Sequence, residues 1–306
     1  MCGFNGCVTM GKQCHRFGRM ILEHRGPDAF GKSHGSFRGY SFYLEHYRLS
    51  IIDLDSRSNQ PFSNGNHTLV FNGEIYNYRE LREKLKKQGV QFKTDSDTEV
   101  LFNGLLLHGV EYLNELDGMY SFAFLNPDKS KLILCRDPVG AKPLYYRLDE
   151  NAILFSSELK AIKQSVNSPE SLDFDALLQY LTSGYITSPM TPFKDIKKVQ
   201  PGTYLEINFS NEKIDVEIQR YHNVSKISKT NGLLETVINS VDKRLVSDLP
   251  VGVFLSGGID SSLVAAIAAR ELGRTDLKTY TVSFNGPQDE ASAASDIAKL
   301  LGLSNE

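Results

Sequence analysis

The chain begins Met1-Cys2-Gly3-Phe4, and the second residue of this stretch is the one around which the fold is built. Removal of Met1 would leave Cys2 with a thiol and a free α-amine on the same residue. A thiol needs a base to be a good nucleophile near neutral pH, and an α-amine titrates at roughly 7.7–8.0. Cys2 could then act as nucleophile and proton acceptor together. Taken alone, a Met-Cys start favours a buried cysteine, so the rest of the chain must decide.

Composition indicates a globular protein of about two domains. The chain has 306 residues, a formal net charge of −3 and 41% hydrophobic residues. The near-neutral charge leaves no basic stripe for a nucleic acid, and we expect no such partner. No run approaches the roughly 20 apolar residues that span a bilayer, so we expect no membrane segment.

The cysteines predict a reducing environment. Three of the four, Cys2, Cys7 and Cys14, lie in the first 14 residues, and Cys135 is distant. They form no C-x-x-C pair and have no matching histidine spacing. We therefore interpret them as reduced thiols, with neither a disulfide framework nor a zinc site. The N-terminus also lacks a basic segment followed by an apolar core, which predicts a cytoplasmic protein.

The first two thirds of the chain alternate short strand-like runs with turns. The runs cover residues 2–8, 46–52, 68–72, 119–125, 131–136, 144–148 and 152–155. Amphipathic or apolar periodicity predicts helices over residues 78–88 and 98–107. Short neighbouring strands with few crossover helices predict antiparallel sheets with helices packed outside.

Four polar segments in this part are candidates for chemistry. The first, at residues 24–28, is typical of a turn because Pro and Gly punctuate loops. Arg48 lies in an apolar strand, where a guanidinium pairs with a structural carboxylate or holds a ligand. Asn72-Gly73 is typical of a tight turn, but an amide and an adjacent backbone N–H could also form an oxyanion hole. Ser96 fits a helix N-cap, and Asp97 after it could bind an ammonium group.

Together these groups describe a site for an amino acid whose side-chain carbonyl is attacked by a thiol. The motifs also resemble, in order, the glutaminase domain of class II glutamine amidotransferases. They are Cys2-Gly3-Phe4, His24-Arg25-Gly26-Pro27-Asp28, Arg48-Leu49-Ser50, Asn72-Gly73-Glu74-Ile75-Tyr76-Asn77 and Ser96-Asp97-Thr98-Glu99. Residues 136–146 and 156–161 resemble the glutamine-hydrolysing asparagine synthetase branch in particular.

The resemblance implies an α+β N-terminal-nucleophile sandwich of two antiparallel sheets between helical layers (αββα). It implies Cys2 as nucleophile, its own amine as base, and Asn72 with Gly73 as oxyanion hole. Glutamine would be bound by residues from three segments, namely Arg48, Leu49, Ser50, Ile51, Ile52, Asn72, Gly73, Glu74 and Asp97. Arg48 would take the α-carboxylate and Asp97 the α-amine.

A second chemical motif follows a polar linker. Residues 251–255 form a short apolar run before Ser256-Gly257-Gly258-Ile259-Asp260-Ser261-Ser262 and a helical pattern. A strand, a glycine turn and a helix N-terminus make a phosphate cradle, and no G-K-[ST] is present for a Walker A loop. Serines with an aspartate suit pyrophosphate and Mg²⁺.

This string resembles the ATP-pyrophosphatase loop of asparagine synthetases. The resemblance implies an α/β parallel sheet that binds ATP through Leu255, Ser256, Gly257, Gly258, Asp260, Ser261, Ser262 and Val282. Asp260 is the candidate Mg²⁺ ligand. We expect a glutaminase domain with its connection over residues 1–211, a linker over 212–230, and an incomplete synthetase domain over 231–306.

The implied reaction is glutamine-dependent asparagine synthesis from aspartate and ATP. Because the family's synthetase domain is longer, we expect a truncated chain that hydrolyses glutamine but makes little amide product. A related amidotransferase acting on another carboxylate, such as a sugar acid, and a non-catalytic binding module remain alternatives. A homodimer is an expectation of the resemblance alone.

Overall fold

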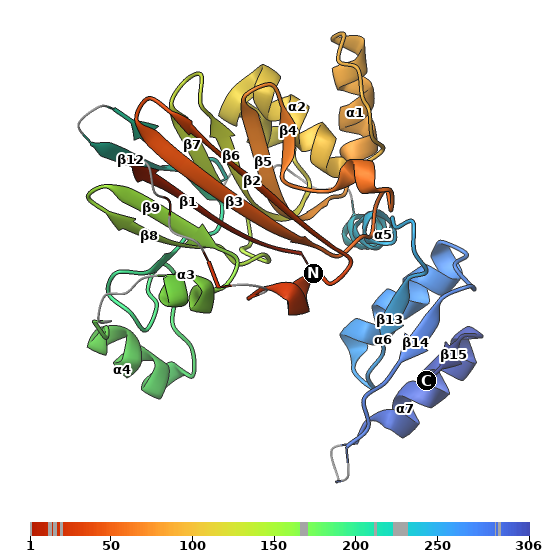
Figure 1. Cartoon of the computed structure of the whole chain (residues 1–306). Helices are drawn as coiled ribbons and strands as arrows, with labels where there is room; N and C mark the ends of the chain where they lie inside the picture. The colour runs from red at the N-terminus through yellow and green to blue at the C-terminus, as the bar shows by residue number, and fades with distance from the viewer. Residues whose placement is uncertain are drawn as a thin grey trace. The chain divides into compact units, whose positions relative to one another are not determined.

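The chain divides into two compact units, Met1–Ser225 and Lys226–Glu306. A computed structural model describes residues 2–11, 14, 17–18, 21–165, 171–210, 213–222, 232–284, 286 and 289–306 (Figure 1). Of the predicted linker, residues 212 and 223–230 lie outside this description. The two units are described separately below.

The first unit is built on two six-stranded antiparallel sheets. The first sheet has the order β10-β8-β9-β1-β3-β2. Its strands are β1 (Gly3–Met10), β2 (Ala29–Phe37), β3 (Tyr40–Arg48), β8 (Tyr145–Asp149), β9 (Ala152–Ser156) and β10 (Lys197–Lys198). The second sheet has the order β12-β11-β7-β6-β5-β4. Its strands are β4 (Phe62–Asn64), β5 (His67–Ile75), β6 (Gly118–Asn126), β7 (Lys131–Arg136), β11 (Thr203–Phe209) and β12 (Ile214–Arg220).

The main core lies between these sheets because each strand turns alternate side chains inward. In β1, Phe4 and Val8 join an apolar cluster with Val70 and Leu134 of the second sheet. Cys7, one residue out of phase, belongs to a separate cluster on the opposite face. Both faces of the first sheet are therefore covered.

Helices cover the outer faces of the sandwich (Figure 1). They are α1 (Tyr78–Lys87), α2 (Asp97–His108), α3 (Leu159–Ser165) and α4 (Phe174–Ser183), with 3-10 turns η1 (Glu23–Arg25), η2 (Ser56–Ser58) and η3 (Gly109–Glu115). Helix α2 packs on β4 and β5, α1 packs on α2, and α3 packs on β8 and β9. This arrangement confirms the predicted αββα sandwich.

Two local predictions differ from the structure in this unit. Asn72-Gly73 lies inside β5, which continues to Ile75, and does not form a turn. The predicted linker contains β12, which pairs with β11 along its whole length, so residues 214–220 belong to the second sheet. The linker boundaries themselves stay a prediction.

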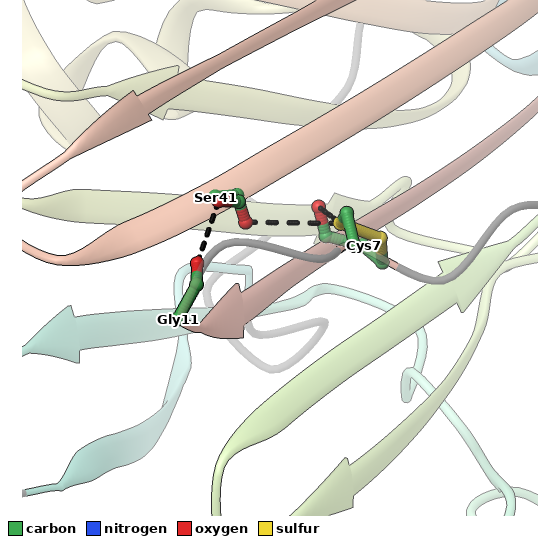
Figure 2. The surroundings of a disulfide bond; sticks show 4 residues. Cys7, Gly11 and Ser41 are labelled. Atoms are coloured by element: carbon green, nitrogen blue, oxygen red, sulfur yellow. Dashed lines mark hydrogen bonds between the residues drawn. A yellow bond between two sulfur atoms is a disulfide. The ribbon is translucent and has the colours of Figure 1, made fainter.

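The prediction of four reduced thiols was wrong, because Cys7 and Cys14 form a disulfide (Figure 2). Their Cα atoms are 6.5 Å apart, which is within the range that a disulfide bridges. Beside the bond, the Ser41 hydroxyl donates to the Gly11 carbonyl at 2.6 Å. Cys2 and Cys135 carry free thiols.

The second unit contains a three-stranded parallel sheet of order β13-β14-β15. Its elements are α5 (Leu233–Arg244), β13 (Gly252–Phe254), α6 (Ile259–Ala266), a π-helical turn (Ile267–Glu271), β14 (Lys278–Tyr280), α7 (Ala291–Leu301) and β15 (Ser304–Asn305). The sequence indicated two strands, and β15 is a third. Parallel strands joined through helices confirm the expected partial α/β sheet. Among the described residues of both units, no helix has the length and apolar character needed to cross a membrane.

Replacing Phe155 by Ala should lower the free energy of unfolding of the first unit by about 3–5 kcal/mol. Phe155 is fully buried and packs edge-on against Phe4. Urea unfolding followed by tyrosine fluorescence measures this change, because Tyr280 is the only tyrosine in the second unit. Phe174→Ala is the matched control, since Phe174 is 72% exposed. Equal losses in the two variants would contradict the proposed sandwich core.

Candidate functional site

Two hydrogen bonds hold the backbone at Cys2 and the start of β1. Arg25 Nε donates to the Cys2 carbonyl at 2.9 Å, and Arg25 also contacts Glu158 at 3.2 Å. The Phe4 N–H donates to Ser157 Oγ at 3.1 Å. The sequence assigned the segment containing Arg25 to a turn, but its side chain holds the backbone of the candidate nucleophile.

The Cys2 thiol is enclosed by the backbone of Leu49. The Leu49 N–H donates to Cys2 Sγ at 3.3 Å, and Sγ lies 3.5 Å from the Leu49 carbonyl. Burial raises the pKa of the Cys2 thiol, and the hydrogen bond to Leu49 opposes this rise. The thiol therefore needs a base before it can attack near neutral pH.

Arg48 is buried at the end of β3 and is held by backbone carbonyls. Its guanidinium donates to the carbonyls of Ile52 and Asp55, at 3.2 and 2.9 Å, and to Asn59 Oδ1 at 2.8 Å. In the described part of the chain, no carboxylate lies within ion-pair distance of Arg48. The loop therefore fixes the guanidinium in place without neutralising its charge.

Asp97 is a buried acidic residue in the first turn of α2, opposite in charge to Arg48. Ser96 caps this helix by accepting from the Glu99 N–H, as predicted. Asp97 accepts a 3.0 Å hydrogen bond from the Ile75 N–H, and no cation pairs with it among the residues described. Burial and the nearby charge of Glu74 together raise the pKa of Asp97 to about 7, although the hydrogen bond from the Ile75 N–H lowers it. A bound ammonium group would favour its ionised form.

Asn72 has no partner for either end of its amide. The residue is fully buried in β5, and Nδ2 and Oδ1 both lack hydrogen bonds within the described structure. A buried polar group left in this state costs about 1–3 kcal/mol. Gly73 beside it approaches the Met119 carbonyl so closely that a Cβ would collide with it.

These groups line one cavity in the first unit. Most of the predicted glutaminase residues line this cavity, namely Cys2, Arg48, Leu49, Ile51, Ile52, Asn72, Gly73, Glu74 and Asp97. Ser50 is not part of the wall, and its N–H donates to the Asp28 carboxylate at 2.7 Å. Five further wall residues were missed, namely Gln60, Phe71, Thr98, Met119 and Lys142. Lys142 was in a quoted motif, but nothing in its spacing indicated chemistry.

The predicted ATP residues gather where β13 and β14 end. Leu255 N–H donates to the Tyr280 carbonyl at 2.9 Å, which joins the loop to β14, and Val282 follows that strand. Inside the loop, Ser256 and Ser261 share a 2.8 Å hydrogen bond between their hydroxyls. Carboxyl ends of parallel strands are the usual ligand-binding edge of such sheets.

The loop already contacts one anionic oxygen. The Gly257 N–H donates to a Glu290 carboxylate oxygen at 3.2 Å, from the start of α7. This contact shows that the loop's amides can accommodate an anion, as a phosphate cradle requires. Within the described ranges, no group of three or more His, Cys, Asp or Glu side chains could hold a metal ion. Asp260 is exposed at the start of α6.

Comparison with known proteins agrees with this geometry. The family model described as "Glutamine amidotransferase domain" matches residues 1–222, which is more than half of the chain. The chain belongs to the glutamine amidotransferase domain family. A second family model, "Asparagine synthase", matches residues 232–306.

Two relatives of this chain are the proteins of Bacillus subtilis named glutamine-hydrolysing asparagine synthetases 1 and 3. They are 36% and 34% identical to it, over 100% and 96% of the chain. The chain spans about half the length of these relatives, 49% and 50%.

A solved structure of a Bacillus subtilis glutamine phosphoribosylpyrophosphate amidotransferase is similar in fold. It matches with a TM-score of 0.52 at 22% identity, over 100% of this chain and 65% of that one. This likeness supports the N-terminal-nucleophile fold of the amidotransferase domain.

Replacing Gly73 by Ala should disturb the cavity, because the added Cβ meets the backbone of Met119 and Tyr120. We expect a loss of about 1–3 kcal/mol in the free energy of unfolding, which is typical of overpacking. Urea unfolding of the first unit measures it. Unchanged stability would mean that β5 and β6 do not approach as described.

Proposed function

We propose that the first unit hydrolyses glutamine through a thioester on Cys2. The observation that carries the proposal is the set of unpaired groups in one cavity. Arg48 lacks a carboxylate, Asp97 lacks a cation, and the amide of Asn72 lacks both partners, among the residues described. A zwitterionic amino acid with a side-chain carbonyl would supply all of these partners.

In this proposal, Arg48 binds the α-carboxylate of glutamine and Asp97 binds its α-ammonium group. The four terminal N–H groups of the guanidinium already donate to Ile52, Asp53, Asp55 and Asn59, so its positive charge and its Nε–H would attract the carboxylate. The backbone of Leu49, Ile51 and Ile52, with Glu74, would line the rest of the pocket. Asn72 and the Gly73 N–H would face the side-chain carbonyl oxygen and stabilise the negative charge that develops there.

The chemistry uses atoms that Cys2 carries after Met1 is removed. The thiol gives its proton to its own α-amine, and sulfur bonds to the carboxamide carbon while the carbonyl electrons move to oxygen. Collapse of this intermediate breaks the C–N bond of the carboxamide. The leaving nitrogen takes the proton back from the α-ammonium group of Cys2, and ammonia departs. Water then adds to the thioester, sulfur leaves with a proton, and glutamate is released.

For the second unit we propose ATP binding at the loop between β13 and α6. The family match and the anion contact of Gly257 support this assignment. The residues proposed are Leu255, Ser256, Gly257, Gly258, Asp260, Ser261, Ser262 and Val282. Mg²⁺ usually binds through one or two carboxylates and substrate phosphates, and Asp260 is our proposed carboxylate ligand. ATP would supply an adenylate of the acceptor carboxylate.

For the whole protein we propose glutamine-dependent asparagine synthesis, in which ammonia from the first unit displaces AMP from adenylated aspartate. The names of the relatives, asparagine synthetases, support aspartate as acceptor. A homodimer rests on the family resemblance alone. A cytoplasmic location suits an enzyme that consumes glutamine and ATP, whereas the Cys7–Cys14 disulfide weighs against it.

Replacing Cys2 by Ala should reduce glutamate release from glutamine by at least about 10³-fold, because the nucleophile is lost. Glutamate is measured directly, and N-terminal mass analysis establishes whether Met1 has been removed. Cys135→Ala is the control, since Cys135 is a free thiol buried away from the cavity. Equal turnover by the Cys2 variant and the parent chain would sink the mechanism.

The pH dependence should identify Asp97. Its pKa is about 7 in the ligand-free protein, and the ionised form binds ammonium, so kcat/KM should fall as pH drops through 7. The α-amine of Cys2 is also protonated in this pH range and then cannot accept the proton of the thiol. The fall in kcat/KM at low pH, the acid limb of the profile, should therefore involve two protons. In Asp97→Asn one proton should disappear from this limb, and KM should rise by on the order of 10²–10³-fold. An unchanged limb and KM would contradict the assignment.

A further inference from the structure

Lys142 is a buried cation on the cavity wall with no protein partner. Its side chain is about one-twentieth exposed, and the described residues give its ammonium neither a hydrogen bond nor an ion pair. Arg48, the other buried cation on the cavity wall, donates to several carbonyls, and so does the half-buried Arg136 before Lys142 in the chain. Burying a lysine in this way has a free-energy cost that folding alone does not recover.

The segment that carries Lys142 is held firmly. The Asp137 carboxylate accepts from the N–H groups of Ala141 and Lys142, both at 2.9 Å. The Arg136 guanidinium donates to the carbonyls of Gly140 and Lys142, at 2.7 and 2.8 Å. Gly140 has φ +72°, a conformation that favours glycine. The loop therefore fixes the backbone of Lys142 at the cavity.

Glu74 is an acidic residue on the same cavity wall as Lys142. It lies on β5 directly after Asn72-Gly73 and also lines the cavity. Burial raises the pKa of Glu74, and the Lys142 ammonium lowers it. Burial lowers the pKa of Lys142, and Glu74 raises it. Each group thus favours the ionised form of the other.

The remaining charges around the pair have smaller effects. Cys2 and Asp137 favour the Lys142 ammonium, and Arg25 opposes it. Asp97, which also lines the cavity, is a like charge, because Glu74 raises its pKa. Two carboxylates therefore share this part of the wall, and Lys142 is the cation that offsets one of them.

We propose that Lys142 is a positioning residue of the glutamine site, which acts by keeping Glu74 a carboxylate that accepts hydrogen bonds from the ligand. This inference rests on the proposed glutaminase function. It assigns to Lys142 a role through Glu74, without contact between its ammonium and the reacting atoms. Because Glu74 follows the proposed oxyanion hole in β5, its charge state affects substrate binding more than the chemical step.

The test measures glutamine binding by calorimetry in a Cys2→Ser background, which separates binding from hydrolysis. Lys142→Met should raise Kd about tenfold near neutral pH, and binding should be lost on acidification about one pH unit higher than in the parent. Lys142→Arg keeps the charge and should restore binding to within about threefold. Lys198→Met, another partly buried lysine that bonds to the Ile186 carbonyl, should leave Kd unchanged.

A double-mutant cycle tests the route through Glu74. Glu74→Gln should raise Kd, and adding Lys142→Met should change it by no more than about twofold further. If the increases in Kd of the two single variants multiply in the double variant, the proposal is overturned. Equal increases in Kd for Lys142→Met and Lys142→Arg would also overturn it, as would an unchanged Kd for Lys142→Met. Thermal unfolding of each variant identifies any that fail to fold. Absence of glutamine binding in the parent would count against the proposed function instead.

Discussion

Arg48 and Asp97 are both buried on the wall of one cavity, yet neither meets an opposite protein charge among the described residues. Removing an ion from water costs several kcal/mol, and hydrogen bonds recover part of this cost. Arg48 is bonded to carbonyls of the loop after β3, and Asp97 to the Ile75 N–H. The carbonyls do not cancel the charge of the guanidinium, and burial leaves Asp97 with a raised pKa despite its backbone hydrogen bonds. Both groups are therefore left to attract a ligand that carries both signs.

The sandwich makes this arrangement stable by fixing the cavity from several directions. Asp53 accepts from the Ser58 hydroxyl and from the Asp95 N–H, both at 2.7 Å, and so joins the loop that holds Arg48 to the segment before α2. Arg25 holds the Cys2 carbonyl from another side. Preorganisation of this kind lowers the cost of arranging charged groups around a bound ligand.

The second unit uses a different physical device for its proposed ligand. Its loop offers backbone N–H groups and serine hydroxyls where the two strands β13 and β14 end, and small side chains let an anion approach closely. The contact between Gly257 and Glu290 shows that a carboxylate already reaches one of these amides. Neutral donors of this type bind phosphates through the helix N-terminus and need no buried lysine.

The sequence by itself determined what depends on neighbouring residues: the Ser96 cap, the helix that follows it, the strand–glycine–helix loop at residues 251–262, and the clustering of motifs that indicated an amidotransferase fold. The tertiary structure decided what depends on residues far apart in the chain. It placed Asn72-Gly73 inside a strand, left Ser50 off the cavity wall, paired Cys7 with Cys14, and brought Lys142 and Glu74 to the wall of one cavity. Spacing along the chain cannot predict these features. A disulfide, a buried charge and an unpaired amide depend on distances in space and on the exclusion of water. These distances and this exclusion arise only when β1, β3, β5 and the loop after β7 pack together.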